Sequence, residues 1–324
     1  MILEDPAQDG PRLVFADWLE EQGDPRAEFI RLQIELSQLP EQDPRRDRLM
    51  DREMQLLNLH GPDWRREIPE WARQGCDFVR GFVEHVHVWG AWWADYGPRL
   101  SETAPVRRLT LHDLGEGLGN FAAGPSLRHL AELAFLDERM GPAELRDLSK
   151  SQTALAGVTS LQFMGMNLTD TGALILSLCE HLGKMTRLEL VRCRIEARGV
   201  RQIADATNMP ALTWLNLSDN YLENDSAWYL ANSPVMKQLT GLCLNDNKFT
   251  TETARWLTES DSTQNLTHLE LMGNHIGDAG VQQIIERFPN LQHLNISRNP
   301  LTPSMMLRLR QQYGRRVRLG MPGE

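Results

Sequence analysis

Four histidines and one glutamate have a spacing that could support metal chemistry. His268 and His293 occupy corresponding positions of two similar segments, and Glu270 follows His268 by two residues. His85 and His87 form a second pair, on one face of an expected strand. Imidazole and carboxylate groups bind zinc, but a zinc site needs three or four ligands in fixed geometry. Because spacing identifies no third-ligand or second-shell candidate, we predict solvated histidines, no metal and no cofactor.

Catalytic motifs are missing from the sequence. It contains no GxSxG, GxxxxGK[ST], HExxH or GxGxxG segment. Cys243 is a candidate nucleophile, but the sequence places no basic group beside it to lower the thiol pKa. We therefore predict that the chain is not an enzyme.

A repeated apolar pattern between Val158 and Leu301 must position these side chains. It has the form Leu-x-x-Leu-x-Leu-x-x-Asn-x-Leu and occurs six times, starting at residues 158, 185, 212, 239, 266 and 291. The intervals are 27 residues four times and then 25. Regular spacing of this length is typical of a solenoid.

The second half of each repeat predicts a helix. Apolar residues three apart, such as Ala173 with Leu176 and Val200 with Ile203, give one buried helical face. A side chain with an oxygen atom precedes four of these stripes, and we expect it to cap the N-terminus of its own helix. These four residues are Asp170, Asn224, Thr251 and Asp278.

The repeats resemble leucine-rich repeats of the longer, ribonuclease-inhibitor-like type. The resemblance implies an α/β solenoid, with a curved parallel sheet on the concave side and helices on the convex side. It also implies a buried asparagine that bonds turn backbone groups, at Asn220, Asn247, Asn274 and Asn299. Cys193 is an accepted variant at this position, whereas Met166 cannot make the hydrogen bond, so we expect an irregular turn there.

Three degenerate repeats precede the clear ones. The template fits segments that start at Val83, Val106 and Leu130. We therefore expect about nine strands in a solenoid spanning residues 76–324, with residues 302–324 as a C-terminal cap. Both ends of such a sheet need covering.

Residues 1–75 are expected to form a helical capping module. The segments PRLVFADWLEEQG and DPRAEFIRLQIELSQL predict two helices, and a third is expected from Pro44 to Leu59. The run DGPRLVFADWLEEQGDPRAEFIRLQIEL resembles the repeat-companion domain of bacterial, especially planctomycete, proteins. Members usually carry another helical turn or two before this run, which favours an internal or truncated start at Met1.

Composition sets limits on the partner and the compartment. The net charge of −10 argues against a nucleic-acid partner. The four cysteines show no paired spacing and predict reduced thiols. There is no apolar run long enough to span a bilayer, and the first ten residues lack a secretory signal. We expect a monomeric, cytoplasmic protein without membrane contact.

Function is expected on the exposed positions of the strands, because the periodic residues belong to the core. Parallel stacking aligns these positions in columns on the concave face. Trp and Arg concentrate binding energy at interfaces, which makes Trp214 a candidate protein-binding residue; packing on its own neighbours is the alternative. A second-position column of threonines is expected to be structural. The predicted partner-binding residues are Arg187, Glu189, Trp214, Asn216, His268, Glu270 and His293.

We predict a non-catalytic module that binds a protein or peptide on its concave face. One alternative is a regulator of a partner enzyme, an inhibitor or a GTPase-activating-like protein, acting through Arg187 or Arg192. Another is a scaffold that recruits its partner through the helical module. Substitution of Trp214 separates binding on the concave face from the scaffold.

Overall fold

A computed structural model describes residues 2–40, 42–113, 127, 129–136 and 140–319. The chain forms two compact units, Met1–Leu133 and Ala134–Glu324. Strand β4 (Glu132–Leu136) crosses the division between them. The predicted functional division after residue 75 stays a prediction.

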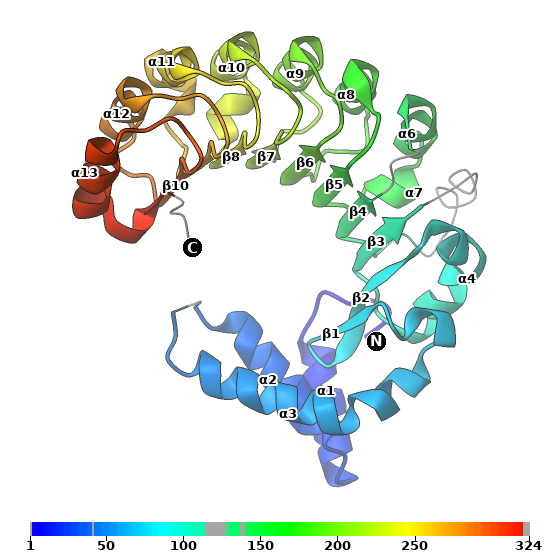
Figure 1. Ribbon diagram of the computed structural model, residues 1–324. Helices are drawn as coiled ribbons and strands as arrows, with labels where there is room; N and C mark the ends of the chain where they lie inside the picture. Colours follow the sequence, from blue (N-terminus) through cyan, green and yellow to red (C-terminus); the bar gives the residue numbers. More distant parts are fainter. Residues whose placement is uncertain (1, 41, 114–126, 128, 137–139, 320–324) are drawn as a thin grey trace. The chain divides into compact units, whose positions relative to one another are not determined.

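The second unit alternates strands and helices. Figure 1 shows its strands along the inner side of a curve and the helices α8 to α12 along the outer side. Neighbouring strands from β5 to β11 are parallel and follow one another in chain order. The strands are β5 (Ser160–Met164), β6 (Arg187–Val191), β7 (Trp214–Asn216), β8 (Gly241–Cys243), β9 (His268–Glu270), β10 (His293–Asn295) and β11 (Val317–Arg318). The helices are α6 (Pro142–Ser149), α7 (Gln152–Leu155), α8 (Thr169–Leu178), α9 (Ala197–Ala204), α10 (Asn224–Ala231), α11 (Thr251–Glu259), α12 (Asp278–Arg287) and α13 (Pro303–Tyr313).

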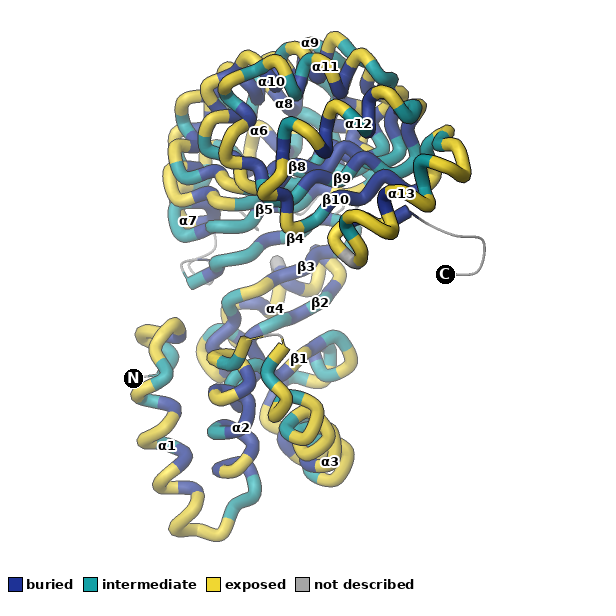
Figure 2. Tube along the Cα trace, turned by 90° about the vertical axis from the view of Figure 1, so that its left-hand side faces the viewer, coloured by how far each residue is buried: buried dark blue, intermediate teal, exposed yellow. Residues whose placement is uncertain are grey.

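The predicted α/β solenoid is confirmed, and each strand of the six clear repeats starts at the same position of the repeat template. Each strand from β5 to β10 begins at the third position of its repeat. The fourth position is at most 2% exposed in all six repeats, and Figure 2 shows the corresponding dark band along the sheet. Burying one leucine contributes about 1.5–3 kcal/mol, so these residues stabilise the solenoid only when repeats stack. The six are Leu161, Leu188, Leu215, Leu242, Leu269 and Leu294.

The buried asparagines bond the turns of adjacent repeats. The Oδ1 atom of Asn247 accepts the N–H groups of Asn220 and Leu222, at 3.1 and 2.9 Å. Its Nδ2 atom donates to three carbonyl oxygens, those of Leu217, Leu244 and Asn245, each at 3.1 Å. Asn220 repeats this pattern, and Asn274 and Asn299 each accept one N–H group and donate to three carbonyl oxygens, which confirms the predicted role.

Cys193 continues the same ladder, and the turn at Met166 is irregular as predicted. The thiol of Cys193 lies 3.4 Å from the carbonyl oxygen of Phe163 and bonds the N–H of Met166. Met166 is buried in the core instead. Thr169, three residues further, has a φ of 56°, a left-handed conformation that no other described repeat adopts at this position.

The prediction that four side chains cap their own helices was wrong. Asp170 lies inside helix α8, and its Oδ1 accepts the N–H of Glu196, which precedes α9, at 2.8 Å. Asn224 accepts the N–H of Thr250 at 3.0 Å in the same way. Thr251 accepts from Gly277, and Asp278 accepts from Thr302. Each oxygen therefore bonds the backbone at the start of the next helix, which stacking places beside it.

Three helices and a β-hairpin form the start of the first unit. Helices α1 (Gly10–Glu21), α2 (Arg26–Gln38) and α3 (Arg46–Trp64) confirm the three predicted helices, although α3 continues five residues past Leu59. The antiparallel hairpin of β1 (Cys76–Val79) and β2 (Phe82–Trp89) precedes α4 (Gly90–Thr103) and β3 (Arg108–His112). Short 3-10 helices cover Arg65–Glu67 and Glu70–Ala72. Strand β1 lies outside the repeat template and was not predicted.

Three polar residues of the N-terminal run hold the hairpin turn at Arg80 and Gly81. Arg12 donates to the carbonyl oxygen of Arg80 at 3.2 Å, and Arg26 donates to that of Gly81 at 3.2 Å. Gln33 accepts the N–H of Gly81 at 2.7 Å. Both turn residues have positive φ, 49° and 86°, as a two-residue hairpin turn requires. These residues of the run thus bind the turn, while membership of the repeat-companion family stays a prediction.

Two further properties follow from the described residues. None of their helices is both long and apolar enough to cross a membrane. All four cysteines are free thiols, as predicted, and all four are buried. The cytoplasmic location stays a prediction.

Candidate functional site

The third and fifth positions of strands β6 to β10 present their side chains on the concave side of the sheet, here called the inner face. Strand register places Arg187 beside Trp214 and His268 beside His293. Glu189 pairs with Asn216 in the same way. The structure therefore brings the predicted residues onto one face, as two groups on either side of β8. Those residues are Arg187, Glu189, Trp214, Asn216, His268, Glu270 and His293.

Trp214 is half-buried and held on both sides. The guanidinium carbon of Arg187 lies 4.2 Å from the centre of the indole, a cation–π contact. The ring of His268 lies 6.0 Å away on the other side. The indole also covers Gly241 on β8, where a side chain would collide with it. Trp214 therefore packs on its own neighbours, as the alternative interpretation expects, although the residue is not fully buried.

Glu189 is the acceptor of the first group. Its carboxylate receives Arg187 Nε at 2.5 Å and Asn216 Nδ2 at 3.2 Å. Gln162 from β5 reaches the same carboxylate at 3.5 Å. The carboxylate therefore fixes the guanidinium that packs on Trp214.

Glu270 is the acceptor of the second group. It bonds His293 Nε2 at 2.6 Å and Asn295 Nδ2 at 2.7 Å. Asn245, from the seventh position of its repeat, donates to it at 3.2 Å. Asn245 was not among the predicted partner-binding residues, although its column position was the available signal.

The inner-face histidines, His268 and His293, make contacts with neighbouring side chains and with each other. His268 Nδ1 lies 2.9 Å from Thr267 Oγ1, and the ring stacks on His293 at 6.1 Å between centres. Within the described ranges, these histidines and Glu270 do not bring three ligand atoms within metal-binding distance of one another.

Cys243 lies between the two groups and is buried. Burial raises the pKa of its thiol to about 12, and the charges of Glu270 and Glu189 add to this shift. A protonated thiol is a poor nucleophile. The inner face thus offers contact surface, with no activated nucleophile at this position.

The threonine column bonds strand to strand. The hydroxyl of Thr213 donates to the carbonyl oxygen of Thr186 at 3.2 Å, and Thr240 donates to Thr213 at the same distance. Thr186 and Thr267 make the equivalent bonds. The predicted structural role of this column is confirmed.

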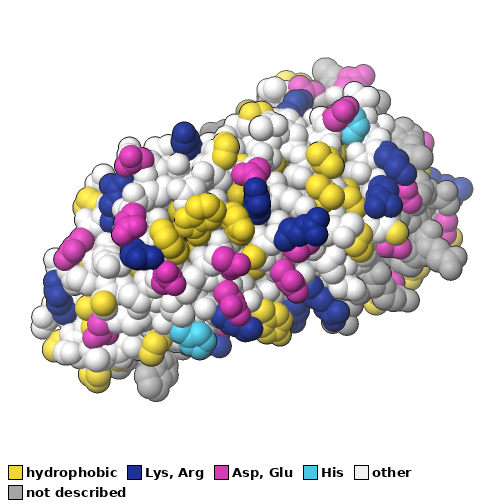
Figure 3. All heavy atoms as spheres, turned by 90° about the horizontal axis from the view of Figure 1, so that it is seen from above, with side chains coloured by type: hydrophobic (Ala, Val, Ile, Leu, Met, Phe, Trp, Pro, Cys, Tyr) yellow, Lys and Arg dark blue, Asp and Glu magenta, His cyan; other side chains and the backbone are white. Residues whose placement is uncertain are grey.

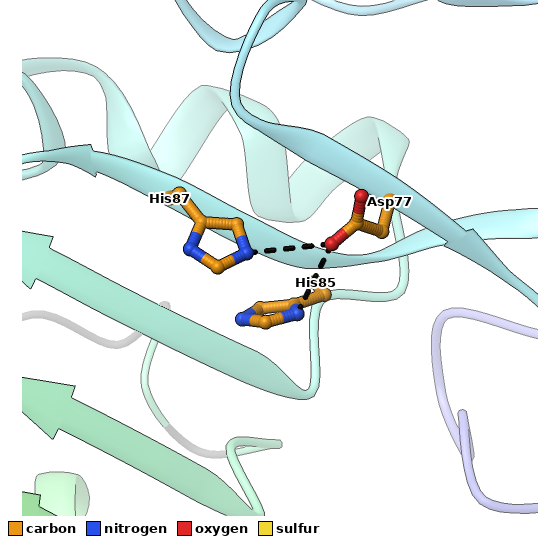
Figure 4. Close-up of side chains that lie close together, drawn as sticks. All are labelled: Asp77, His85 and His87. Atoms are coloured by element: carbon orange, nitrogen blue, oxygen red, sulfur yellow. Dashed lines mark hydrogen bonds and ion pairs between the residues drawn. The ribbon is translucent and has the colours of Figure 1, made fainter. Parts of the chain in front are cut away.

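A different set of side chains meets in the first unit. Asp77, His85 and His87 are the one group of three potential metal ligands among the described residues whose ligand atoms all lie within 4.8 Å of one another. Figure 4 shows both imidazoles directed at the same carboxylate. Sequence spacing paired the histidines but missed Asp77, because strand β1 was not predicted.

Comparisons with known proteins identify the repeats. A leucine-rich-repeat family model matches residues 263–284, and a second matches residues 290–309. No curated protein matches the chain in sequence.

Several solved structures match the chain at low sequence identity. A leucine-rich-repeat protein of Leptospira interrogans is 18% identical over 66% of this chain and 54% of its own, with a TM-score of 0.37. Listeria monocytogenes InlP is 16% identical over 66% of this chain and 60% of its own, with a TM-score of 0.41. A structure of the yeast Rad7 and Elc1 complex is 13% identical over 96% of this chain and 95% of the matched chain, with a TM-score of 0.42. At these values the likenesses carry no inference about partner or activity.

Proposed function

We propose that this leucine-rich-repeat protein binds a protein or peptide across the inner face of its second unit, without catalysing a reaction. Leucine-rich-repeat proteins act in general through protein–protein interaction. The specific proposal concerns the face between Arg187 and His293.

The observation that carries the proposal is Trp214, a half-buried tryptophan on an open sheet. Its ring is held by Arg187 at 4.2 Å and by His268 at 6.0 Å. An aromatic ring fixed before binding loses little conformational freedom when a partner covers it. Trp and Arg together are also the residue types that dominate interface energies.

The surrounding polar network supports the same function. Glu189 and Glu270 hold the donors on either side of Cys243 in fixed positions. A partner would therefore meet a preorganised surface whose two carboxylates already have defined donors. This lowers the ordering cost of association.

The helical side of the unit offers a different surface. Figure 3 shows basic and acidic side chains interspersed over it, with small groups of apolar side chains between them. Trp228 on α10 is 44% exposed and provides a tryptophan outside the sheet. It serves as the matched control for Trp214.

The regulator alternative requires an arginine that can reach into a partner's active site. Arg187 is bonded to Glu189 at 2.5 Å, and Arg192 is bonded to Asp219 at 2.7 Å. Reaching out would break the contacts of Arg187 with both Glu189 and Trp214, which favours a binding surface at that residue. The pair of Arg192 is largely exposed, so breaking it would cost little.

A pull-down from the native cell extract tests the proposal. The intact chain is compared with a Trp214→Ala, Glu189→Ala double variant whose circular dichroism is unchanged. We expect a protein that co-purifies with the intact chain and is lost from the variant. Equal recovery with both would reject the inner face and favour the scaffold alternative.

A further inference from the structure

The β-hairpin of the first unit brings one carboxylate and two imidazoles together. Asp77 on β1 lies opposite His85 on β2, and His87 follows on the same side of the strand. The intervening Val86 and the next residue, Val88, are buried on the opposite side. Strand alternation therefore leaves both histidines on the outward side of the hairpin, facing the aspartate.

The distances within this cluster fit a shared ion better than direct hydrogen bonds. His85 Nδ1 and His87 Nε2 each lie 3.3 Å from the same Asp77 Oδ2 atom. Charge-assisted hydrogen bonds are typically about 2.7–2.9 Å long. Two ligands bound at about 2.0–2.1 Å to a tetrahedral zinc ion lie roughly 3.3–3.4 Å apart. The two histidine–aspartate pairs thus have the spacing of ligands on one ion, and all three ligand atoms lie within 4.8 Å of one another.

Thr110 on β3 orients the ring of His85. Its Oγ1 lies 3.1 Å from His85 Nε2, and its side chain is buried. A proton on Nε2 that bonds this hydroxyl leaves the Nδ1 lone pair directed at Asp77. Metal-binding histidines commonly have their second nitrogen held in this way.

Arg108 on β3 pairs in register with His85. The positive charge of Arg108 is offset by Glu132, whose Oε1 lies 2.9 Å from its Nε.

We propose that Asp77, His85 and His87 bind a divalent transition-metal ion of the zinc type, with one coordination position left for water or a ligand. The side chains of His87 and Asp77 are 39% and 63% exposed, so this position is open to solvent. His87 also borders a hollow of about 570 Å³ that includes Trp71, Trp89 and His112. A ligand group that enters this hollow can complete the coordination shell.

Zinc titration of the full chain tests the site. The purified protein is stripped with a chelator, dialysed and titrated with zinc chloride by isothermal calorimetry. We expect one saturable site, and cobalt(II) in its place should give the visible absorption of a tetrahedral ion. His87→Ala and Asp77→Asn should each weaken the affinity, by more than the roughly 10- to 100-fold typical of an outer-shell change. Thr110→Val should weaken it by about 10- to 100-fold, because it alters only the orientation of His85.

His60→Ala provides the matched control, because His60 lies on α3 of the same unit and packs on Trp64. It should leave the affinity unchanged. Circular dichroism and thermal unfolding of each metal-free variant separate loss of a ligand from loss of the fold. The proposal is overturned if the stripped chain binds no zinc saturably. It also fails if folded His87→Ala and Asp77→Asn bind zinc as tightly as the unsubstituted chain.

Discussion

The indole of Trp214 lies directly over Gly241, so a Cβ atom at position 241 would fall 2.1 Å from Cε3 of the ring. A glycine on the neighbouring strand therefore gives the tryptophan its place on the inner face. The backbone conformation at position 241 is one that other residues adopt, so glycine is needed there only because a side chain would collide with the indole.

Gly241→Ala should destabilise the protein by about 1–3 kcal/mol, because the indole must move to admit the methyl group. Urea unfolding measures the loss. In a Trp214→Ala background the same change should cost little, since the colliding ring is gone. Gly183→Ala is the control, because nothing lies within 4 Å of a Cβ atom there. Equal costs in both backgrounds would contradict the packing of the ring on Gly241.

The repeat template predicted the positions of the strands because burial in the core requires apolar residues at the same positions of every repeat. A residue such as Leu215 must face the helices, and stacking repeats the requirement in every unit. Contacts across repeats were harder to predict. Asp170 bonds the start of the next helix, and that partner is defined only after the repeats have stacked.

In the candidate sites, too, residues at periodic positions could be predicted and residues outside the periodic pattern could not. Arg187, Trp214 and His268 could be placed on one face because strand positions in register share a side. Asp77 could not, because it belongs to an antiparallel strand outside the periodic pattern. The burial of Arg12 was also missed, because no periodicity signals a charged residue that is enclosed by its partners.

Arg12→Met should destabilise the first unit by about 3 kcal/mol, near the lower end of the cost of breaking a buried ion pair. The side chains of Arg12 and Glu84 are 0% and 4% exposed and lie 2.8 Å apart. Arg80 remains 2.9 Å from Glu84, which limits the loss.

Arg52→Met is the matched control in urea unfolding. Arg52 pairs with Glu28 at 2.7 Å, but both side chains are about half exposed. Its loss should cost less than about 1 kcal/mol. Similar costs for the two arginines would show that the buried pair has no special role in stability.

Asn247→Ala should destabilise the solenoid by about 3 kcal/mol or more. Its amide serves two N–H groups and three carbonyl oxygens that would lose their buried partner. Asn265→Ala, at an exposed asparagine that donates to the carbonyl oxygen of Lys237, should cost less than about 1 kcal/mol. Unfolding in urea distinguishes the two, and a small effect at Asn247 would contradict the ladder.

The thiol of Cys243 should react slowly with Ellman's reagent in the native protein at pH 8. With a pKa of about 12, roughly one thiol in ten thousand is ionised at that pH. Cys193 has the same raised pKa, and all four thiols are buried. Unfolding should make them react rapidly. A fast native reaction assigned to Cys243 by mass spectrometry would contradict its buried, protonated state.

The dissociation constant of the co-purified partner, measured by calorimetry, tests binding at the inner face most directly. Trp214→Ala should weaken the affinity by tenfold or more, which corresponds to about 1.4 kcal/mol or more. Trp228→Ala, on helix α10, should leave it unchanged. Equal affinities for Trp214→Ala and the unsubstituted protein, with the fold intact, would contradict the account.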